Sequence, residues 1–261
     1  MNTVQPVDAA LNQPFTPPGW PAAVRLYQSS REHAGLGQPP YDCFNVALHV
    51  GDDPAQVLQH RLDLLQELAP AGVQRIDWLN QVHGTAVHQD TDPLQWPAWD
   101  ADAAVTGQAG QALAIMTADC LPVVLCDAAG TAVACIHAGW RGLCAGVIEA
   151  AAARMAQPPA RAWLGPCIGP AAFEVGEPVR AAFVAQDARA GIAFVPGRAG
   201  HHWANLPQLA AQRLEKLGIS AIVNTAACTV QQPEFFSYRR EGRTGRLVTL
   251  VWRVPEPGPA Q

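Results

Sequence analysis

Three short segments of the chain place a histidine or a cysteine beside turn-forming residues. They read NQVHG over 80–84, TADCLP over 117–122 and HAGWRG over 137–142. In each segment a predicted strand gives way to a turn, and side chains at strand ends converge in open α/β sheets. Two imidazoles and one thiolate that leave a fourth position free are the ligand pattern of catalytic zinc. His83, Cys120 and His137 are therefore candidate ligands of one metal ion.

A structural role is the alternative for each of these residues. A histidine that follows a strand is often hydrogen-bonded within the protein, and a cysteine in an apolar run often packs as a small hydrophobic residue. The separations between the three residues match no local zinc-finger pattern such as C-x₂-C. Spacing alone leaves both interpretations open.

Strands and helices alternate along the chain and must position these residues. Asp53 and Pro54 are expected as N-cap and first residue of a helix with leucines at helical spacing. Further helices are predicted over 143–155 and 207–217, the second ended by Gly218. Strands are predicted over 75–82, 112–116, 122–126, 131–136 and 248–253, with a turn at 127–130 that suggests a buried strand pair.

This order of elements predicts a mixed α/β, or α+β, sandwich. We expect a single domain over residues 1–261 with a central, mostly buried sheet flanked by helices, because neither a linker nor an internal repeat divides the chain. The proline-rich tail over 255–261 is expected to fray.

Composition narrows the class of protein further. The chain has 261 residues, 15% of them charged and 49% hydrophobic, with a net charge of −5. This argues against a disordered chain, a basic nucleic-acid binder and a membrane-spanning protein. The N-terminus carries no signal-peptide pattern, so we expect a cytoplasmic protein. The 7 cysteines are then expected as reduced thiols and not as a disulfide framework.

Six ordered motifs resemble one known family. They are NQVHG, DADAAVT, TADCLPVVL, HAGWRG, GPCIGPAAFEVG and FFSYRREGRTGR, and the likeness runs from about Arg31 to Trp252. The chain is thereby similar to the laccase-domain, or YfiH-like, family, whose members are also named polyphenol oxidase, peptidoglycan editing factor and multi-substrate purine nucleoside phosphorylase. The resemblance implies a single α/β sandwich. It also implies a zinc ion, with copper as the alternative, held in a cleft by His83, Cys120 and His137.

The resemblance implies an enzyme that phosphorolyses adenosine, inosine and S-methyl-5′-thioadenosine and also deaminates adenosine. A nucleoside and phosphate are then its small-molecule partners. The protein itself is expected to be a monomer or a weak homodimer. Deamination needs a base, and the chain lacks both the H-x-E glutamate and the C-x-x-C pair of ordinary zinc deaminases. Asp119, next to Cys120, is the candidate base, with a turn or capping role as its alternative.

Phosphorolysis also needs an anion site. Arg141 follows His137 in a glycine-flanked turn that opens a helix, which predicts a phosphate contact. By resemblance Arg31 and Asn45 line the same cleft as substrate-binding residues. The family has Arg, one residue and Gly-Gly-Val-Ser, whereas residues 31–37 read REHAGLG with one extra residue, which leaves the role of Arg31 open.

Other functions remain alternatives. A copper oxidase shares the His₂Cys ligand set, although no H-x-H pair is present. A hydrolase that edits a peptidoglycan precursor would use Cys120 as nucleophile and His137 as base. A binding protein would leave the functional residue types at the strand ends unexplained.

Overall fold

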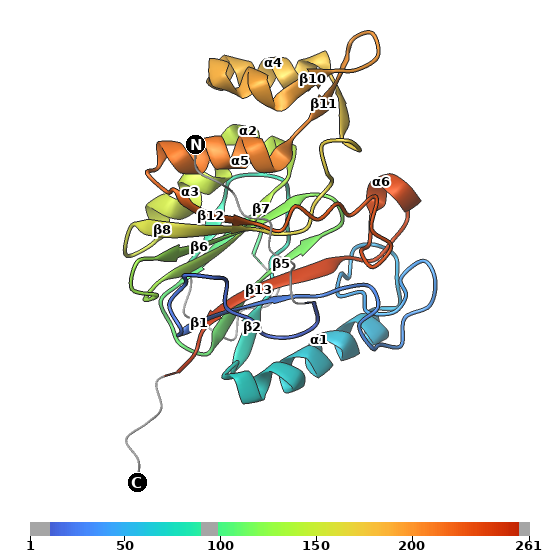
Figure 1. Cartoon of the computed structure of the whole chain (residues 1–261). Helices are drawn as coiled ribbons and strands as arrows, with labels where there is room; N and C mark the ends of the chain where they lie inside the picture. The colour runs from blue at the N-terminus through green and yellow to red at the C-terminus, as the bar shows by residue number, and fades with distance from the viewer. Residues whose placement is uncertain (1–10, 90–98, 256–261) are drawn as a thin grey trace.

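The computed structural model describes residues 11–89 and 99–255. Within them, strands form two large sheets and one small one (Figure 1). The four-stranded sheet has the order β1 (Val24–Gln28), β13 (Leu247–Arg253), β5 (Gln111–Thr117) and β2 (Arg75–Asp77). The six-stranded sheet has the order β12 (Ala221–Asn224), β8 (Pro159–Leu164), β6 (Leu121–Asp127), β7 (Val133–Ala138), β4 (Ala103–Thr106) and β3 (Val87–His88). The small sheet joins β10 (Phe194–Pro196), β11 (His201–Ala204) and β9 (Glu174–Gly176).

The helices are short and lie outside the two large sheets (Figure 1). They are α1 (Pro54–Leu68), α2 (Trp140–Ala145), α3 (Val147–Arg154), α4 (Glu177–Gln186), α5 (Leu206–Lys216) and α6 (Tyr238–Glu241), with 3₁₀ turns at Ala69–Ala71 and Ala188–Ala193.

The two large sheets pack face to face over a buried apolar layer. Leu113, Ile115 and Val251 from the four-stranded sheet belong to one cluster with Val124 and Cys135 from the six-stranded sheet. Every residue of β5, β6 and β7 is buried, so these strands are covered on both faces. Strands of this kind read as continuous apolar runs without alternation, which explains their sequence pattern.

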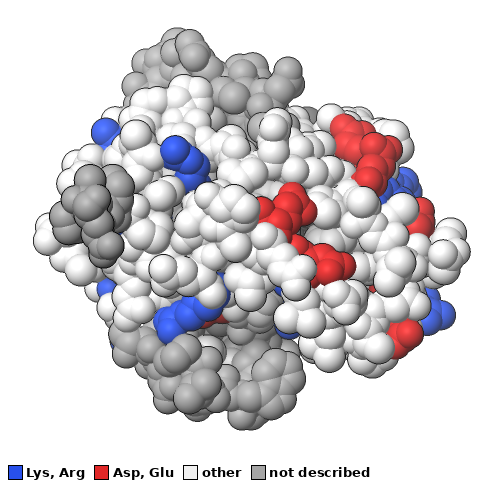
Figure 2. Space-filling view, turned by 90° about the horizontal axis from the view of Figure 1, so that it is seen from below, with Lys and Arg blue, Asp and Glu red and all other residues white. Residues whose placement is uncertain are grey.

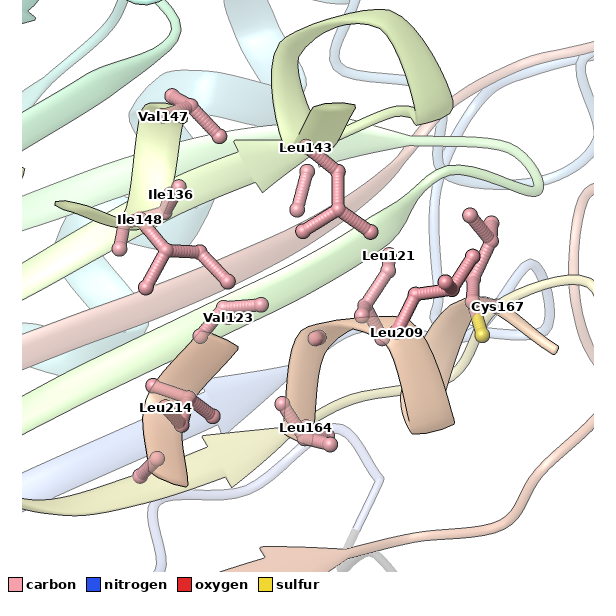
Figure 3. Close-up of a cluster of buried hydrophobic side chains, with 14 of the residues drawn as sticks. Leu121, Val123, Ile136, Leu143, Val147, Ile148, Leu164, Cys167, Leu209 and Leu214 are labelled. Carbon is pink, nitrogen blue, oxygen red and sulfur yellow. The ribbon is translucent and has the colours of Figure 1, made fainter. Parts of the chain in front are cut away.

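Helices cover the outer face of each sheet. On the four-stranded sheet, Leu64 and Leu68 of α1 pack against Trp252. On the six-stranded sheet, side chains of α2, α3 and α5 meet those of β6, β7 and β8 (Figure 3). The labelled members of this layer are Leu121, Val123, Ile136, Leu143, Val147, Ile148, Leu164, Cys167, Leu209 and Leu214. The resulting order is helix, sheet, sheet, helix.

The predicted mixed α/β class is confirmed, and several elements form where the sequence indicates. The Asp53 side chain accepts a hydrogen bond from the Ala55 N–H and caps α1. β6 and β7 form the predicted antiparallel pair, with the Asp127 carboxylate holding the turn through the Ala132 N–H. The difference lies in the layers: the central sheet is two stacked sheets, because β5 pairs with β13 and β2 instead of with β6.

The strand predicted over 75–82 ends early, at Asp77. Farther along, the Gln81 amide takes the place of a strand partner: it donates to the Met116 carbonyl at 2.8 Å and accepts from the Met116 N–H at 2.8 Å. The backbone N–H groups of residues 82–84 bond a carboxylate instead of a neighbouring strand. Because the Gln81 side chain and not the backbone pairs with Met116, the chain leaves the sheet here and forms the loop that carries His83.

The helix predicted over 143–155 is two helices, because Gly146 interrupts it. Gly146 has φ +99°, ends α2 by donating to the carbonyls of Gly142 and Leu143, and begins α3. A positive φ of this kind is readily adopted only by glycine. The break separates α3, whose Val147, Ile148 and Ala151 pack against the six-stranded sheet, from α2, which carries Trp140 and Arg141.

The described surface adds two observations. On the face in Figure 2, Lys and Arg side chains of the described residues stand apart and form no continuous basic stripe. Among helices of the described residues, none has the length and apolar character needed to cross a membrane. Apart from Pro255, the tail expected to fray lies outside the described residues.

Gly146→Ala separates the two interpretations of residues 143–155. In a continuous helix the change would stabilise the protein by about 0.5–1 kcal/mol. With φ at +99° we expect a lower free energy of unfolding, by about 1–2 kcal/mol, because an alanine Cβ is strained there. Urea unfolding measures the change, and Gly146→Asn is expected to cost less. A more stable alanine variant would contradict the observed break.

Candidate metal centre

The three candidate ligands meet where β6, β7 and the loop after β2 come together. Cys120 immediately precedes β6, His137 lies in β7, and His83 lies in the loop before β3. Leu121 pairs with Ala138 across the two strands, which brings Cys120 beside His137. One ligand atom of each residue lies within 4.8 Å of the other two, and Cys120 Sγ is 4.0 Å from His83 Nε2. The structure therefore unites residues that are far apart in the chain.

Gly139 leaves the space between the ligands open. A Cβ at this position would lie 3.0 Å from Cys120 Sγ, 3.2 Å from His83 Cδ2 and 3.5 Å from His137 Nε2. The backbone of Gly139 has φ −61° and ψ 156°, which any residue can adopt. Glycine is needed here for room and not for conformation.

Asp102 orients two of the ligands. Its carboxylate is fully buried and accepts a hydrogen bond from His137 Nδ1 at 2.7 Å. It also accepts from the backbone N–H groups of Val82, His83 and Gly84 at 3.2, 2.9 and 2.6 Å. The first bond places the proton of His137 on Nδ1 and leaves Nε2 free to bind a metal ion. The other three hold His83 at φ +60°, in the left-handed region.

The ionisable groups of the metal centre shift the pKa values of one another. Burial would raise the pKa of Asp102, but hydrogen bonds from His137, Gly84 and His83 keep that pKa below its usual value. Burial would also raise the pKa of the Cys120 thiol, but His137 and His83 outweigh it and lower the pKa to about 6. Burial lowers the pKa of His137, whereas Cys120 and Asp102 raise it more strongly, to about 9. Cys120 and His137 therefore each favour the charged form of the other.

The donor set fits a catalytic metal ion. It offers two imidazole nitrogens and a thiolate of lowered pKa, the combination that binds zinc, and the carboxylate behind His137 is the usual partner of a zinc-bound histidine. His83 is exposed, Cys120 is half-buried and His137 is buried, so one side of the centre faces solvent. That side offers the fourth position that a substrate or water needs.

The centre opens into a cleft of about 380 Å³. This volume lies in the range of small-molecule sites, about 300–1,000 Å³. The cleft is lined by His49, Gln81, His83, Met116, Thr117, Ala118, Cys120, His137, Tyr238 and Arg246. Apolar, aromatic, cationic and metal-binding groups therefore line the same cleft.

Two predicted catalytic residues lie near the metal ligands but outside this lining. The Asp119 carboxylate accepts from the Thr229 hydroxyl at 2.6 Å and from the Arg239 N–H at 2.6 Å, so both its oxygens are engaged. Arg141 is exposed on α2, with its guanidinium 4.6 Å from the centroid of the Trp140 ring. The structure does not bring either side chain into the cleft.

Two residues of the N-terminal segment, Arg31 and Asn45, were predicted to bind substrate. In the structure their side chains make ion pairs and hydrogen bonds within the protein. Arg31 pairs with Asp42 at 3.2 Å and with Glu241 at 2.5 Å. Asn45 is fully buried and its side-chain oxygen accepts from the N–H groups of Ala47 and Arg246 at 3.0 and 2.9 Å. Neither residue lines the cleft, but Asn45 places the backbone of one that does.

Sequence reasoning did not single out three residues that surround the metal ligands, Asp102, His49 and Arg246, and included a fourth, Tyr238, only within a motif. Asp102 carries a recognisable signal, a carboxylate beside the buried run 103–106. His49 and Arg246 have no local pattern, since they reach the cleft only through tertiary folding. Tyr238 lies in an aromatic and basic motif that is compatible with purine stacking, anion binding or packing, and its side chain is 58% exposed at the cleft.

Asp102→Asn is expected to weaken metal binding about 10–100-fold, the usual effect of losing the partner of a zinc-bound histidine. The amide cannot accept from His137 and all three backbone donors as the carboxylate does. Competition with a chromophoric chelator measures the affinity, and Asp63→Asn on the exposed face of α1 is the matched control. Gly139→Ala, which fills the space between the ligands, is expected to weaken binding as well. Unchanged affinity in both variants would rule out this centre.

Metal affinity is expected to rise with pH. Between about pH 6 and 9, Cys120 is already a thiolate while His137 still carries a proton that must leave when a metal ion binds. Loss of one proton makes the apparent affinity rise about tenfold per pH unit in this window, and the rise levels off above it. Chelator competition at a series of pH values gives the slope. A slope of two protons between pH 7 and 8 would show a neutral Cys120 thiol.

Comparison with known proteins agrees with this geometry. Residues 26–254 match the family described as multi-copper polyphenol oxidoreductase laccase. The chain is 44% identical to "Purine nucleoside phosphorylase YfiH" of Escherichia coli over 91% of this chain and 98% of that protein. It is 45% identical to a purine nucleoside phosphorylase of Pseudomonas aeruginosa, over 90% and 96% of the two chains.

A crystal structure from Neisseria meningitidis has the same fold, with a TM-score of 0.84 and 40% identity over 90% of this chain and 96% of that one. The expected resemblance is thus confirmed over nearly the whole length, by sequence and by structure. This protein belongs to the multi-copper polyphenol oxidoreductase laccase family, the laccase-domain family of YfiH-like proteins.

Proposed function

We propose that this protein is a zinc-dependent purine nucleoside phosphorylase. It acts on adenosine, inosine and S-methyl-5′-thioadenosine, and it also deaminates adenosine. One observation carries the proposal: a single cleft combines the His83, Cys120 and His137 ligands with the Tyr238 ring and the Arg246 guanidinium. The names of its relatives, which are purine nucleoside phosphorylases at 44–45% identity, support the same activity.

His83, Cys120 and His137 would hold the zinc ion, and their exposed side would face the substrate. When bound, a zinc ion supplies Lewis-acid polarisation of an oxygen or nitrogen atom of the substrate. Asp102 keeps the proton of His137 on Nδ1, away from the metal-binding nitrogen. Gly139 keeps the approach free of side-chain atoms.

Phosphorolysis exchanges one bond at C1′ of the ribose. An oxygen of hydrogen phosphate forms a bond to C1′ as the bond from C1′ to the purine nitrogen breaks. The electron pair leaves with the purine, which takes up the proton that hydrogen phosphate brings. The exposed Tyr238 ring offers a face on which a purine stacks, and the walls of Met116 and Ala118 are apolar.

Deamination needs a group that moves a proton near the purine. Asp119, the candidate base, would act only after giving up one of its two hydrogen bonds, to Thr229 or to Arg239. Its position suits a second role, because it ties the turn before Cys120 to the start of α6, which carries Tyr238. We therefore assign to Asp119 the placing of Tyr238 over the cleft.

A hydrolase is the second candidate, and one observation favours it. Asp102, His137 and Cys120 lie in the order of a catalytic triad, with a carboxylate on Nδ1 of the histidine and a thiol of lowered pKa on its far side. Such an enzyme could remove a wrongly added amino acid from a peptidoglycan precursor. A triad has no use for His83, however, whereas a metal centre needs its nitrogen.

The phosphorylase is tested by incubating the zinc-loaded protein with inosine and phosphate. We expect hypoxanthine and ribose 1-phosphate, in amounts that depend on phosphate and fall at least tenfold in His83→Gln. Chromatography of the products measures both. The matched control His201→Gln changes a histidine of β11 outside the cleft and is expected to keep the activity.

Failure takes two recognisable forms. Hydrolysis without phosphate, surviving chelator and His83→Gln but lost in Cys120→Ser, would establish the hydrolase instead. Absence of any phosphate-dependent cleavage with full zinc occupancy would refute the phosphorylase.

A further inference from the structure

Arg246 is the arginine in the lining of the metal-centre cleft. Its guanidinium is half-buried in the cleft wall and donates to the carbonyls of Thr244 and Gly245, both at 3.0 Å. Among the described residues, no carboxylate lies within ion-pair distance of it, whereas Arg31 and Arg213 pair with acidic side chains. Burial lowers the pKa of Arg246. Cys120 and Asp119 attract its charge, and its guanidinium lies 5.9 Å from the centroid of the Tyr238 ring. Its donors other than the one bonded to Thr244 and Gly245 make no hydrogen bond to a described residue, so they can bind an anion.

Thr117 offers a second unsatisfied group in the same cleft. It ends β5 opposite Leu247 of β13, so it lies beside the residue that precedes that strand, Arg246. Thr117 is 2% exposed, and its hydroxyl oxygen has no hydrogen-bond partner among the described residues. Buried hydroxyls normally have a partner. The Thr117 oxygen is itself out of solvent, so it reaches a ligand when the side chain rotates toward the cleft that the residue lines.

His49 is the third group. It lines the cleft, and its ring makes no hydrogen bond to any residue that the structure describes. Burial and the positive charges of Arg246, Arg61 and His83 lower the pKa of His49. The His49 side chain is exposed, so its ring N–H meets solvent in the free protein and can be turned to a ligand in the cleft.

We propose that Arg246, Thr117 and His49 form an oxyanion subsite that binds inorganic phosphate. This assignment rests on the proposed phosphorylase function and specifies where its second substrate lies. The guanidinium supplies charge and paired N–H donors, and the hydroxyl and the imidazole supply single donors. The subsite shares the cleft with the metal ligands, so phosphate and the nucleoside meet in one chamber.

The chain as a whole cannot supply this attraction. Its net charge is −5, so its summed field does not draw an anion, and a few placed donors must hold one. Arg141, the phosphate contact indicated by the sequence, lies outside the cleft lining on the surface of α2. Arg246 is the arginine inside the described lining.

The test is calorimetric titration of the zinc-loaded full chain with inorganic phosphate, without nucleoside. We expect Arg246→Gln to raise the Kd for phosphate about 10–100-fold, because hydrogen bonds to charged groups are the strong ones, and Arg246→Lys to raise it less. Thr117→Val, which removes the unpaired hydroxyl, is expected to raise it about 2–10-fold. Arg154→Gln at the exposed end of α3 removes the same charge and is the matched control.

Several results would overturn the subsite. They are phosphate binding that is unchanged in Arg246→Gln, an equal loss in the Arg154→Gln control, or a loss in Arg141→Gln that exceeds the loss in Arg246→Gln. The outcome is independent of turnover. Phosphate binding that depends on Arg246, in a protein that cleaves no nucleoside, would support the subsite and refute only the phosphorylase.

Discussion

One buried carboxylate sets the geometry on which the metal centre depends. Asp102 lies out of solvent, where an ionised carboxylate is tolerated only with several hydrogen-bond donors. It takes these donors from His137 and from three successive N–H groups of the loop 82–84. The hydrogen bonds to Asp102 therefore fold the loop 82–84 and fix the tautomer of His137. They also orient His83 toward His137. The shape of the site follows from the solvation of this acid.

Local signals in the sequence predicted much of the scaffold and the three ligands. The cap at Asp53, the turn at Asp127 and the buried runs of β5 to β7 depend on near neighbours in the chain, and their sequence pattern is visible. His83, Cys120 and His137 were candidates because each stands where a strand meets a turn, the family resemblance marked them as ligands, and the structure places them together. The pairing of β5 with β13 instead of β6 depends on contacts between distant segments, which no local pattern records.

The substrate-facing residues were harder to predict for the same reason. An arginine beside a ligand in the chain need not point the same way: Arg141 stacks on Trp140, whereas Arg246, far from the ligand motifs, lines the cleft. Asn45 shows how the two kinds of residue cooperate, since its buried amide accepts from the Arg246 N–H and so sets the start of β13. The sequence indicated that an arginine should line the cleft. The fold decided that this arginine is Arg246 and not Arg141.

The unequal exposure of the three ligands gives metal exchange a direction. His137 is 3% exposed and anchored by Asp102, while His83 stands in solvent on its loop. A chelator would reach an ion held by these three residues from the His83 side, and the ion would leave only when the buried His137 imidazole also released it. Release is therefore limited by the least accessible ligand and capture by the most accessible one. Slow release at His137 would lengthen the residence of the ion and the exposure of His83 would speed its capture, so both residues would contribute to the equilibrium affinity.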